Sequence, residues 1–256
     1  MPFTPVAPAS PPPPAVAPAA PAFSVGSVVS RSFSAWFGNF VPFSIVALVV
    51  NVPVLALVAW VPGDSRDWEL GIRVLSGLAD LVVTGALTFG VLESLRGGRV
   101  RTGELFRKGF AKMGTVFTVS FRTGMWFILG LILLVVPFVV WYCALFVAVP
   151  AAVVEEGVGS SGDALARSRA LTAGHRWAIF AVALVVLVVN VVLDGIAGIV
   201  LALVGQALPI GIQSLSVASV MTVVSALGAC AHAVAYHDLR VAKEGVATAD
   251  LVKVFE

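Results

Sequence analysis

The chain has 256 residues, of which 59% are hydrophobic and 12% are charged, and its formal net charge is +2. Soluble domains carry about 25% charged residues. Half that charge density, combined with several long apolar runs, excludes an ordinary soluble protein and indicates an integral membrane protein. The small net charge gives no indication of nucleic acid, and we expect no nucleic-acid partner.

The first 22 residues contain nine prolines, and most of the others are alanine. This composition predicts a disordered or polyproline II tail on the cytoplasmic side, which serves either as a spacer or as a docking segment. The tail lacks the basic start and the unbroken apolar stretch of a signal peptide.

Residues 23–39 place apolar side chains at helical spacing, which predicts an amphipathic helix lying on the membrane surface. The first transmembrane span is expected to follow at 40–61. Trp36 and Trp60 are 24 positions apart in the sequence. That separation is roughly 36 Å of helix, so we expect one indole in each membrane interface.

The second span is predicted at 72–93 and contains Asp80. After it, six of the seventeen residues in 96–112 are Lys or Arg. Thr102 can cap a helix over 102–113, in which apolar and basic residues occupy opposite faces. We expect this second amphipathic helix to lie in the cytoplasmic interface.

The apolar run 114–154 contains one charged residue, Arg122. As a straight helix the run would be roughly 60 Å long, twice the hydrocarbon thickness of a bilayer. Pro137 removes a backbone donor and disfavours helical geometry at Val136. The run therefore predicts a hairpin of two helices within the membrane, 115–136 and 138–154.

A third short helix is expected at 163–173, with Asp163 in its first turn and Gly174 closing it. The last two spans are predicted at 178–204 and 213–236. These predictions divide the chain into three parts: a Pro/Ala-rich cytoplasmic tail (1–22), a membrane domain (23–237) and a C-terminal cytoplasmic tail (238–256).

The distribution of Lys and Arg predicts the orientation in the membrane. With six spans, thirteen of these cations fall on one side and two, Arg66 and Arg73, fall on the other. We therefore expect a multi-pass protein of the inner (plasma) membrane, with both termini in the cytoplasm. A five-span arrangement, with 124–148 as one helix, is disfavoured because it would export the basic segment 167–176.

The predicted fold is all-α: a polytopic membrane helix bundle of six transmembrane helices in three hairpins, with cytoplasmic interfacial helices. Each hairpin is preceded by one of the three amphipathic helices. This order suggests a threefold repeat, and chance similarity among amphipathic helices is the alternative explanation.

Polar residues inside a bilayer are the first candidates for function. Asp80 and Asp194 are predicted at similar depth in the outer half, where they could line a shared cavity, meet water separately or bond neighbouring helices. Arg122 can extend its side chain to the phosphate level or pair with an acid. Asn51 and Asn190 are expected to join helices by hydrogen bonds.

The segment 96–112, called the basic segment below, supplies a second set of candidates. Its cations face a leaflet that carries anionic lipid, and each is worth about 1 kcal/mol near such a surface. We therefore predict contacts to lipid headgroups by Arg99, Arg101, Arg107, Lys108 and Lys112.

No catalytic motif for a soluble enzyme is present, and we expect no catalytic residues, cofactor or metal. Cys143 and Cys230 are isolated in apolar runs and are expected to pack as small hydrophobic residues. His232 and His237 do not have the spacing of a helical metal site.

Three stretches resemble a known family. They are GSVVSRSFSAWFGNF at 26–40, AVPAAVVEE with ALARSRALTAGHRW at 148–156 and 164–177, and AYHDLRVAKEG at 235–245. Together they resemble bacterial six-span proteins related to the membrane domain of glycerophosphoryl diester phosphodiesterases, and more loosely the YciC-like membrane proteins. In fusions of that family a separate soluble barrel carries the phosphodiesterase chemistry, so the resemblance implies a membrane domain without that activity.

The leading hypothesis is a non-catalytic membrane module that organises lipid or a membrane or cytoplasmic protein partner. A small transporter for a cation-coupled solute or a lipid is the alternative, and a membrane enzyme acting on lipid headgroups is the third. A water-reaching cavity that holds both Asp80 and Asp194 would favour transport, whereas a close-packed bundle would favour the module.

Overall fold

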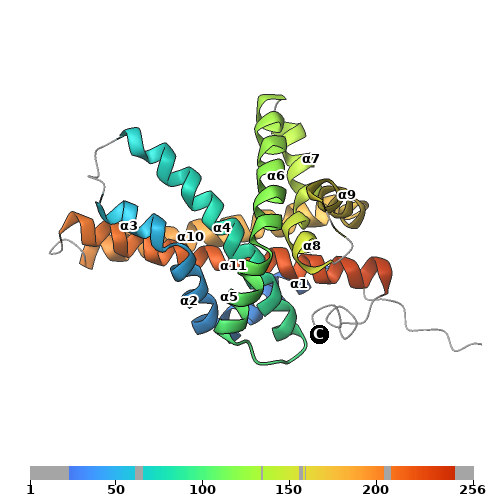
Figure 1. Ribbon diagram of the computed structural model, residues 1–256, viewed down its shortest axis with the longest axis horizontal. Helices are drawn as coiled ribbons and strands as arrows, with labels where there is room; N and C mark the ends of the chain where they lie inside the picture. The colour runs from blue at the N-terminus through green and yellow to red at the C-terminus, as the bar shows by residue number, and fades with distance from the viewer. Residues whose placement is uncertain are drawn as a thin grey trace, which may run out of the picture.

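The computed structural model describes residues 23–60, 66–133, 135–155, 158, 160–204 and 209–245. Every regular element in this part of the chain is a helix (Figure 1). The tail 1–22 and residues 246–256 lie outside the described residues. In chain order the helices are α1 (Val25–Gly38), α2 (Phe40–Val50), α3 (Val52–Trp60), α4 (Arg66–Leu95), α5 (Thr102–Ala111), α6 (Met113–Leu133), α7 (Val135–Leu145), α8 (Ala148–Val154), α9 (Ser161–Thr172), α10 (Arg176–Val204) and α11 (Ile210–Glu244).

Four helical segments in the described residues are long and apolar enough to cross a membrane, and the bent pair α1–α2 brings the number to as many as five. The chain is thus an all-helical, multi-pass membrane protein. The four segments correspond to four of the six predicted spans. The other two predicted spans, 40–61 and 115–136, coincide with α2–α3 and α6, and the six-span, three-hairpin arrangement remains a prediction. The four segments are Gly71–Leu95, Val136–Val154, Arg176–Leu203 and Gly211–Glu244.

Prolines determine where the apolar stretches break. A proline fits the first turn of a helix, but it cannot donate to the carbonyl four residues earlier, and its ring clashes with that carbonyl. The breaks before α2, α3, α7 and α8 are each followed by a proline at the second or third position of the new helix. These residues are Pro42, Pro53, Pro137 and Pro150.

One predicted boundary is wrong for this reason, and one predicted helix contains a further turn. The break was predicted at Val136–Pro137, but α6 ends at Leu133, four residues before Pro137, and α7 begins at Val135. The predicted helix 138–154 is also interrupted, because a turn at 146–147 separates α7 from α8 ahead of Pro150.

The turn between α7 and α8 leaves the carbonyl of Ala144 without its usual helical partner. Two hydroxyl groups of α9 replace that partner: Ser168 Oγ donates to it at 2.8 Å and Thr172 Oγ1 at 3.3 Å. The predicted span 40–61 is broken in a similar way. Asn51 lies between α2 and α3 and is 3% exposed. Its side-chain amide donates to the backbone carbonyl of Ala47 in the preceding helix α2 and in this bond does not join two helices.

The three amphipathic helices form close to their predicted positions as α1, α5 and α9. Ser24 caps α1, and Ser160 and Asp163 form a reciprocal capping box at the start of α9. Gly174 follows α9 with a φ of 84°, the left-handed conformation expected of a closing glycine. Trp36 is 5% exposed, so its indole is covered by neighbouring parts of the protein.

Helix α11 is the central element of the bundle and contacts α1, α2, α3, α4, α8, α9 and α10. In Figure 1 it runs horizontally beside α10, while the α6–α7 hairpin projects nearly at right angles to both. It continues without a break to Glu244, where Gly245 closes it in the left-handed conformation. The predicted domain boundary at 237/238 therefore falls inside a helix.

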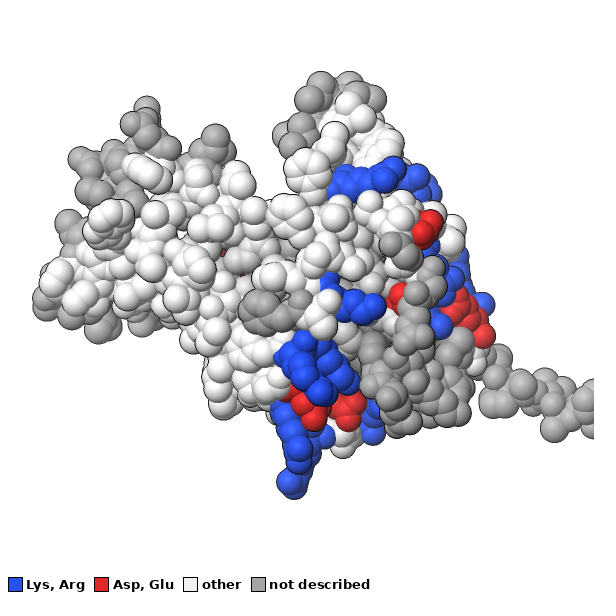
Figure 2. Space-filling model, in the orientation of Figure 1, with Lys and Arg blue, Asp and Glu red and all other residues white. Residues whose placement is uncertain are grey.

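Charged side chains are concentrated at one end of the molecule. Figure 2 shows Lys, Arg, Asp and Glu gathered around α5, α9 and the C-terminal half of α11, while the opposite end of α10, α11 and α3 is almost free of them in this view. Such a division is expected of a chain with one polar end in water and an apolar body in lipid.

Candidate functional site

Helix α5, which carries part of the basic segment, is attached closely to α4. Leu105 is 3% exposed and points into the core. At Gly109 a Cβ would lie 2.7 Å from the Cβ of Ala86. Only glycine allows this approach of the two helices, so α5 packs closely against α4 and leaves Arg107 exposed.

The five predicted headgroup contacts have different surroundings. Arg99, Arg101 and Arg107 are exposed, and Lys108 and Lys112 are partly buried. No acid among the described residues pairs with Arg99 or Arg107 in an ion pair. These two arginines are therefore the members of the set that are best placed to meet an external anion.

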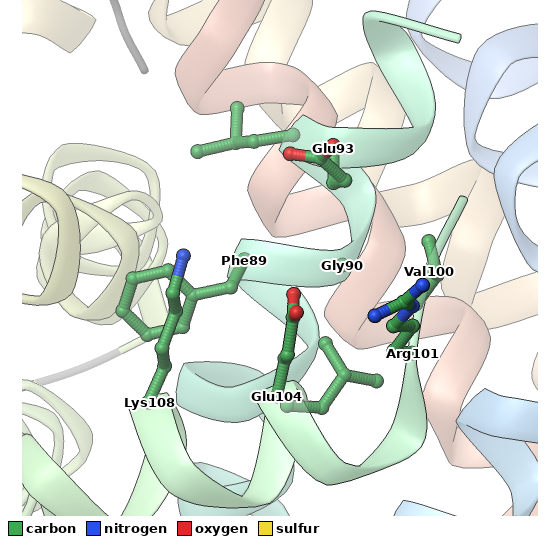
Figure 3. A pocket seen from close by; sticks show the side chains of 9 residues that line it. Phe89, Gly90, Glu93, Val100, Arg101, Glu104 and Lys108 are labelled. Carbon is green, nitrogen blue, oxygen red and sulfur yellow. The ribbon is translucent and has the colours of Figure 1, made fainter. Parts of the chain in front are cut away.

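Arg101 and Lys108 line a small pocket between α4 and α5 instead (Figure 3). The Lys108 ammonium lies 5.9 Å from the centre of the Phe89 ring. Glu104 projects between Lys108 and Arg101, and Glu93 lies above them. The cavity is about 30 Å³, which is room for about one water molecule, so these cations face acids of their own chain.

Asp80 and Asp194 have separate environments. Asp80 Oδ1 accepts a hydrogen bond from Ser225 Oγ of α11 at 3.2 Å, which is the bond to a neighbouring helix that was one of the alternatives. Asp194 lies on α10, whose apolar stretch is only 11% buried inside the protein. Its Oδ1 has no hydrogen-bond partner among the described residues. Neither acid lines the two large grooves described below.

We therefore expect Asp80→Asn and Asp194→Asn to act independently. Because no common partner links them, the two losses of unfolding free energy should add to within about 0.5 kcal/mol. A double-mutant cycle, measured by SDS titration of the purified protein in mixed micelles, tests this. A larger coupling would indicate a shared site and would favour transport.

Asn190 and Arg122, the remaining candidates, are not brought together either. Asn190 Nδ2 donates to the carbonyl of Val186 on its own helix at 2.8 Å. Arg122 is exposed and lines an apolar groove of about 890 Å³ beside α6. One of its guanidinium nitrogens lies 3.8 Å from where a Cβ of Gly162 would be, so the side chain extends toward the start of α9.

A closed ring of polar side chains, which the sequence analysis did not single out, joins α8, α9 and α11. Arg167 Nε donates to Glu155 at 2.7 and 2.9 Å, and its NH2 group donates to Glu244. Arg240 donates to Glu244 at 2.9 Å and to Tyr236 at 3.1 Å. Tyr236 completes the ring by donating to Glu155 at 2.9 Å.

The members of the ring satisfy one another, so the ring is suited to holding helices together. Burial lowers the pKa of Arg167, but its hydrogen bonds to Glu155 and Glu244 outweigh this effect and raise the pKa above the ordinary arginine value. Tyr236 is completely buried. A sequence signal existed: Tyr236, Arg240 and Glu244 recur every four residues and so share one face of a helix.

A second polar link joins the two ends of the described chain. Arg31 of α1 pairs with Asp238 of α11, and Asp238 is also 2.9 Å from His237 Nδ1. The ring and this link use residues of the 235–245 and 164–177 stretches, which gives those stretches a structural role.

The rest of the described chain shows no metal-ligand cluster: no three His, Cys, Asp or Glu side chains lie close enough to hold an ion. Cys143 and Cys230 are free and buried. Comparisons with family models, curated proteins and solved structures return no match to the chain.

Proposed function

We propose that the protein is a non-catalytic membrane module that organises anionic phospholipid, or a membrane partner, at the cytoplasmic side of a bacterial inner membrane. The observation that supports the proposal most directly is that Arg107, on α5 between Leu105 and Gly109, and Arg99, in the loop before α5, are exposed and have no ion-pair partner among the described residues. A fixed cation near the surface attracts lipid phosphates without first having to be ordered.

The charge pattern supports the cytoplasmic orientation of this face, since Lys and Arg gather at the end that carries α5 and α9. The resemblance to the phosphodiesterase membrane domain also fits a membrane module. The residues that carry the resemblance lie partly in the ring of Glu155, Arg167, Tyr236, Arg240 and Glu244, which joins helices together.

A transporter is the second candidate, and one observation favours it. Asp80 is held inside the bundle by Ser225, and an acid within a membrane helix is a common element of proton and cation pathways. The separate environments of Asp80 and Asp194 make this candidate the weaker one.

The Arg99→Gln/Arg107→Gln double variant tests the lipid function. Each cation contributes about 1 kcal/mol of attraction to an anionic surface. Removing both cations should therefore lower the retention of phosphatidylglycerol about thirtyfold relative to phosphatidylcholine. Retained lipid is counted by native mass spectrometry after extraction from nanodiscs that contain both lipids.

Arg73→Gln, on the opposite predicted side, is the matched control and should leave the preference unchanged. High salt should weaken the wild-type preference, because exposed charges are screened within about 10 Å at 0.1 M ionic strength. Equal retention of the two lipids by the wild-type protein would contradict the proposal.

A further inference from the structure

The structure contains a groove that the basic segment does not use. It is about 890 Å³ and is lined mainly by one side of α6, with Ser161 of α9 at its edge. Its α6 residues recur at helical spacing and so form one continuous face. They are Phe117, Thr118, Phe121, Arg122, Met125, Trp126 and Leu129.

A second groove of about 480 Å³ meets the first at Phe117, which lines both. It lies between α2–α3, α4 and the start of α6, and its lining is apolar throughout. Both volumes fall within the range of about 300–1,000 Å³ that is typical of small-molecule sites. The large side chains of the first groove are exposed: Phe117, Phe121 and Met125 are 52%, 62% and 58% exposed.

Among the described residues that line the two grooves, Arg122 is the one that carries a charge. No acid among the described residues pairs with it. Asp163, the nearest acid along the chain from Ser161, is bound by the backbone N–H and hydroxyl of Ser160 at 3.0 and 2.8 Å. A second cation lies behind the groove wall, because the Arg169 guanidinium is 5.3 Å from the centre of the Trp126 ring.

An exposed arginine in a largely apolar groove of a membrane protein favours an anion that also covers apolar surface. A phospholipid with an anionic headgroup meets both requirements. A guanidinium matches a phosphate with two parallel hydrogen bonds, and an acyl chain covers exposed phenylalanine and methionine side chains.

We propose that this groove binds one anionic phospholipid, with its phosphate on Arg122 beside Ser161 and an acyl chain along Phe117, Phe121, Met125 and Leu129. The inference deepens the proposed lipid function and rests on it, but it assigns a specific site that is separate from the basic segment of Arg99 and Arg107.

The test measures protection of one introduced thiol. Cys143 and Cys230 are buried, so Met125→Cys supplies a single accessible cysteine in the groove. Its rate of reaction with N-ethylmaleimide is measured in detergent micelles as phosphatidylglycerol or phosphatidylcholine is added. Val136→Cys is the matched control, because Val136 is 73% exposed and lines neither groove.

Phosphatidylglycerol should protect Met125→Cys at lower concentration than phosphatidylcholine and should not change the rate at Val136→Cys. Adding Arg122→Gln should raise the concentration for half-maximal protection about tenfold or more, the loss expected for a charge-assisted hydrogen bond. Arg122→Lys should restore part of the preference. Arg176→Gln, an exposed cation outside both grooves, should leave it unchanged.

Equal protection by the two lipids, or an unchanged preference in the Arg122→Gln variant, would overturn the site. If that happened while Arg99→Gln/Arg107→Gln still reduced lipid retention, the proposed function would stand without this groove. The reverse result, protection that needs Arg122 together with retention that ignores Arg99 and Arg107, would place lipid recognition in the groove alone.

Discussion

Replacing Glu155 by glutamine should lower the free energy of unfolding in mixed micelles by about 2–4 kcal/mol. Glu155 accepts two hydrogen bonds from Arg167 and one from Tyr236, and glutamine would keep only one acceptor oxygen and no charge, so both of these contacts are weakened. Breaking a buried ion pair costs about 3–5 kcal/mol. We expect slightly less, because the side chains of Arg167 and Glu155 are 27% and 16% exposed and water can partly replace the lost carboxylate.

The measurement is an SDS titration followed by circular dichroism, with Glu93→Gln as the matched control. Glu93 is paired with Arg96 at 3.8 Å, but its side chain is 41% exposed, so its loss should cost no more than about 0.5 kcal/mol. If Glu155→Gln is as mild as the control, the ring does not hold α8, α9 and α11 together.

Apolar composition predicted an all-helical membrane protein and four of its long apolar segments, and proline chemistry explains where the breaks differ. Long runs with few charges fix the existence of a span, since each needs about 20 apolar residues. The break in the run 114–154 was placed next to Pro137, but proline fits the first turn of the following helix. The lost hydrogen bond therefore falls four residues earlier, at Leu133. The same offset accounts for the turn ahead of Pro150.

The polar sites were harder to predict, because counting along a span gives the depth of a residue but not its direction around the helix. Asp80 and Asp194 were placed at similar depth, yet Asp80 faces Ser225 of α11 and Asp194 lies on the little-buried α10. The ring of Glu155 and Arg167 joins residues of α8 and α9 to α11, and only packing determines which of the many acids and cations meet. The spacing of Tyr236, Arg240 and Glu244 indicated a shared face but no partner.

The Phe43→Ala variant should show how far the core controls the basic segment. Phe43 is completely buried where α2, α4 and α5 meet. At Gly90 a Cβ would lie 2.6 Å from the Phe43 ring and 2.9 Å from Leu105. The aromatic ring of Phe43 is therefore tightly packed beneath α5. Truncating a buried phenylalanine costs about 3–5 kcal/mol in soluble proteins. We expect about 2–4 kcal/mol here, because lipid and detergent reduce the hydrophobic part of that loss.

Stability is measured by SDS titration, and the mobility of α5 by hydrogen exchange of its amides. Phe37→Ala is the matched control, because Phe37 is 63% exposed and mainly loses ring contacts with its neighbours, which are worth about 0.5–1.5 kcal/mol. In Phe43→Ala the amides of Thr102–Ala111 should exchange faster, and preference for phosphatidylglycerol should fall although every cation is still present. If preference is unchanged while α5 exchanges faster, lipid attraction depends on the charge of the segment and not on its fixed position, and the argument from a fixed Arg107 fails.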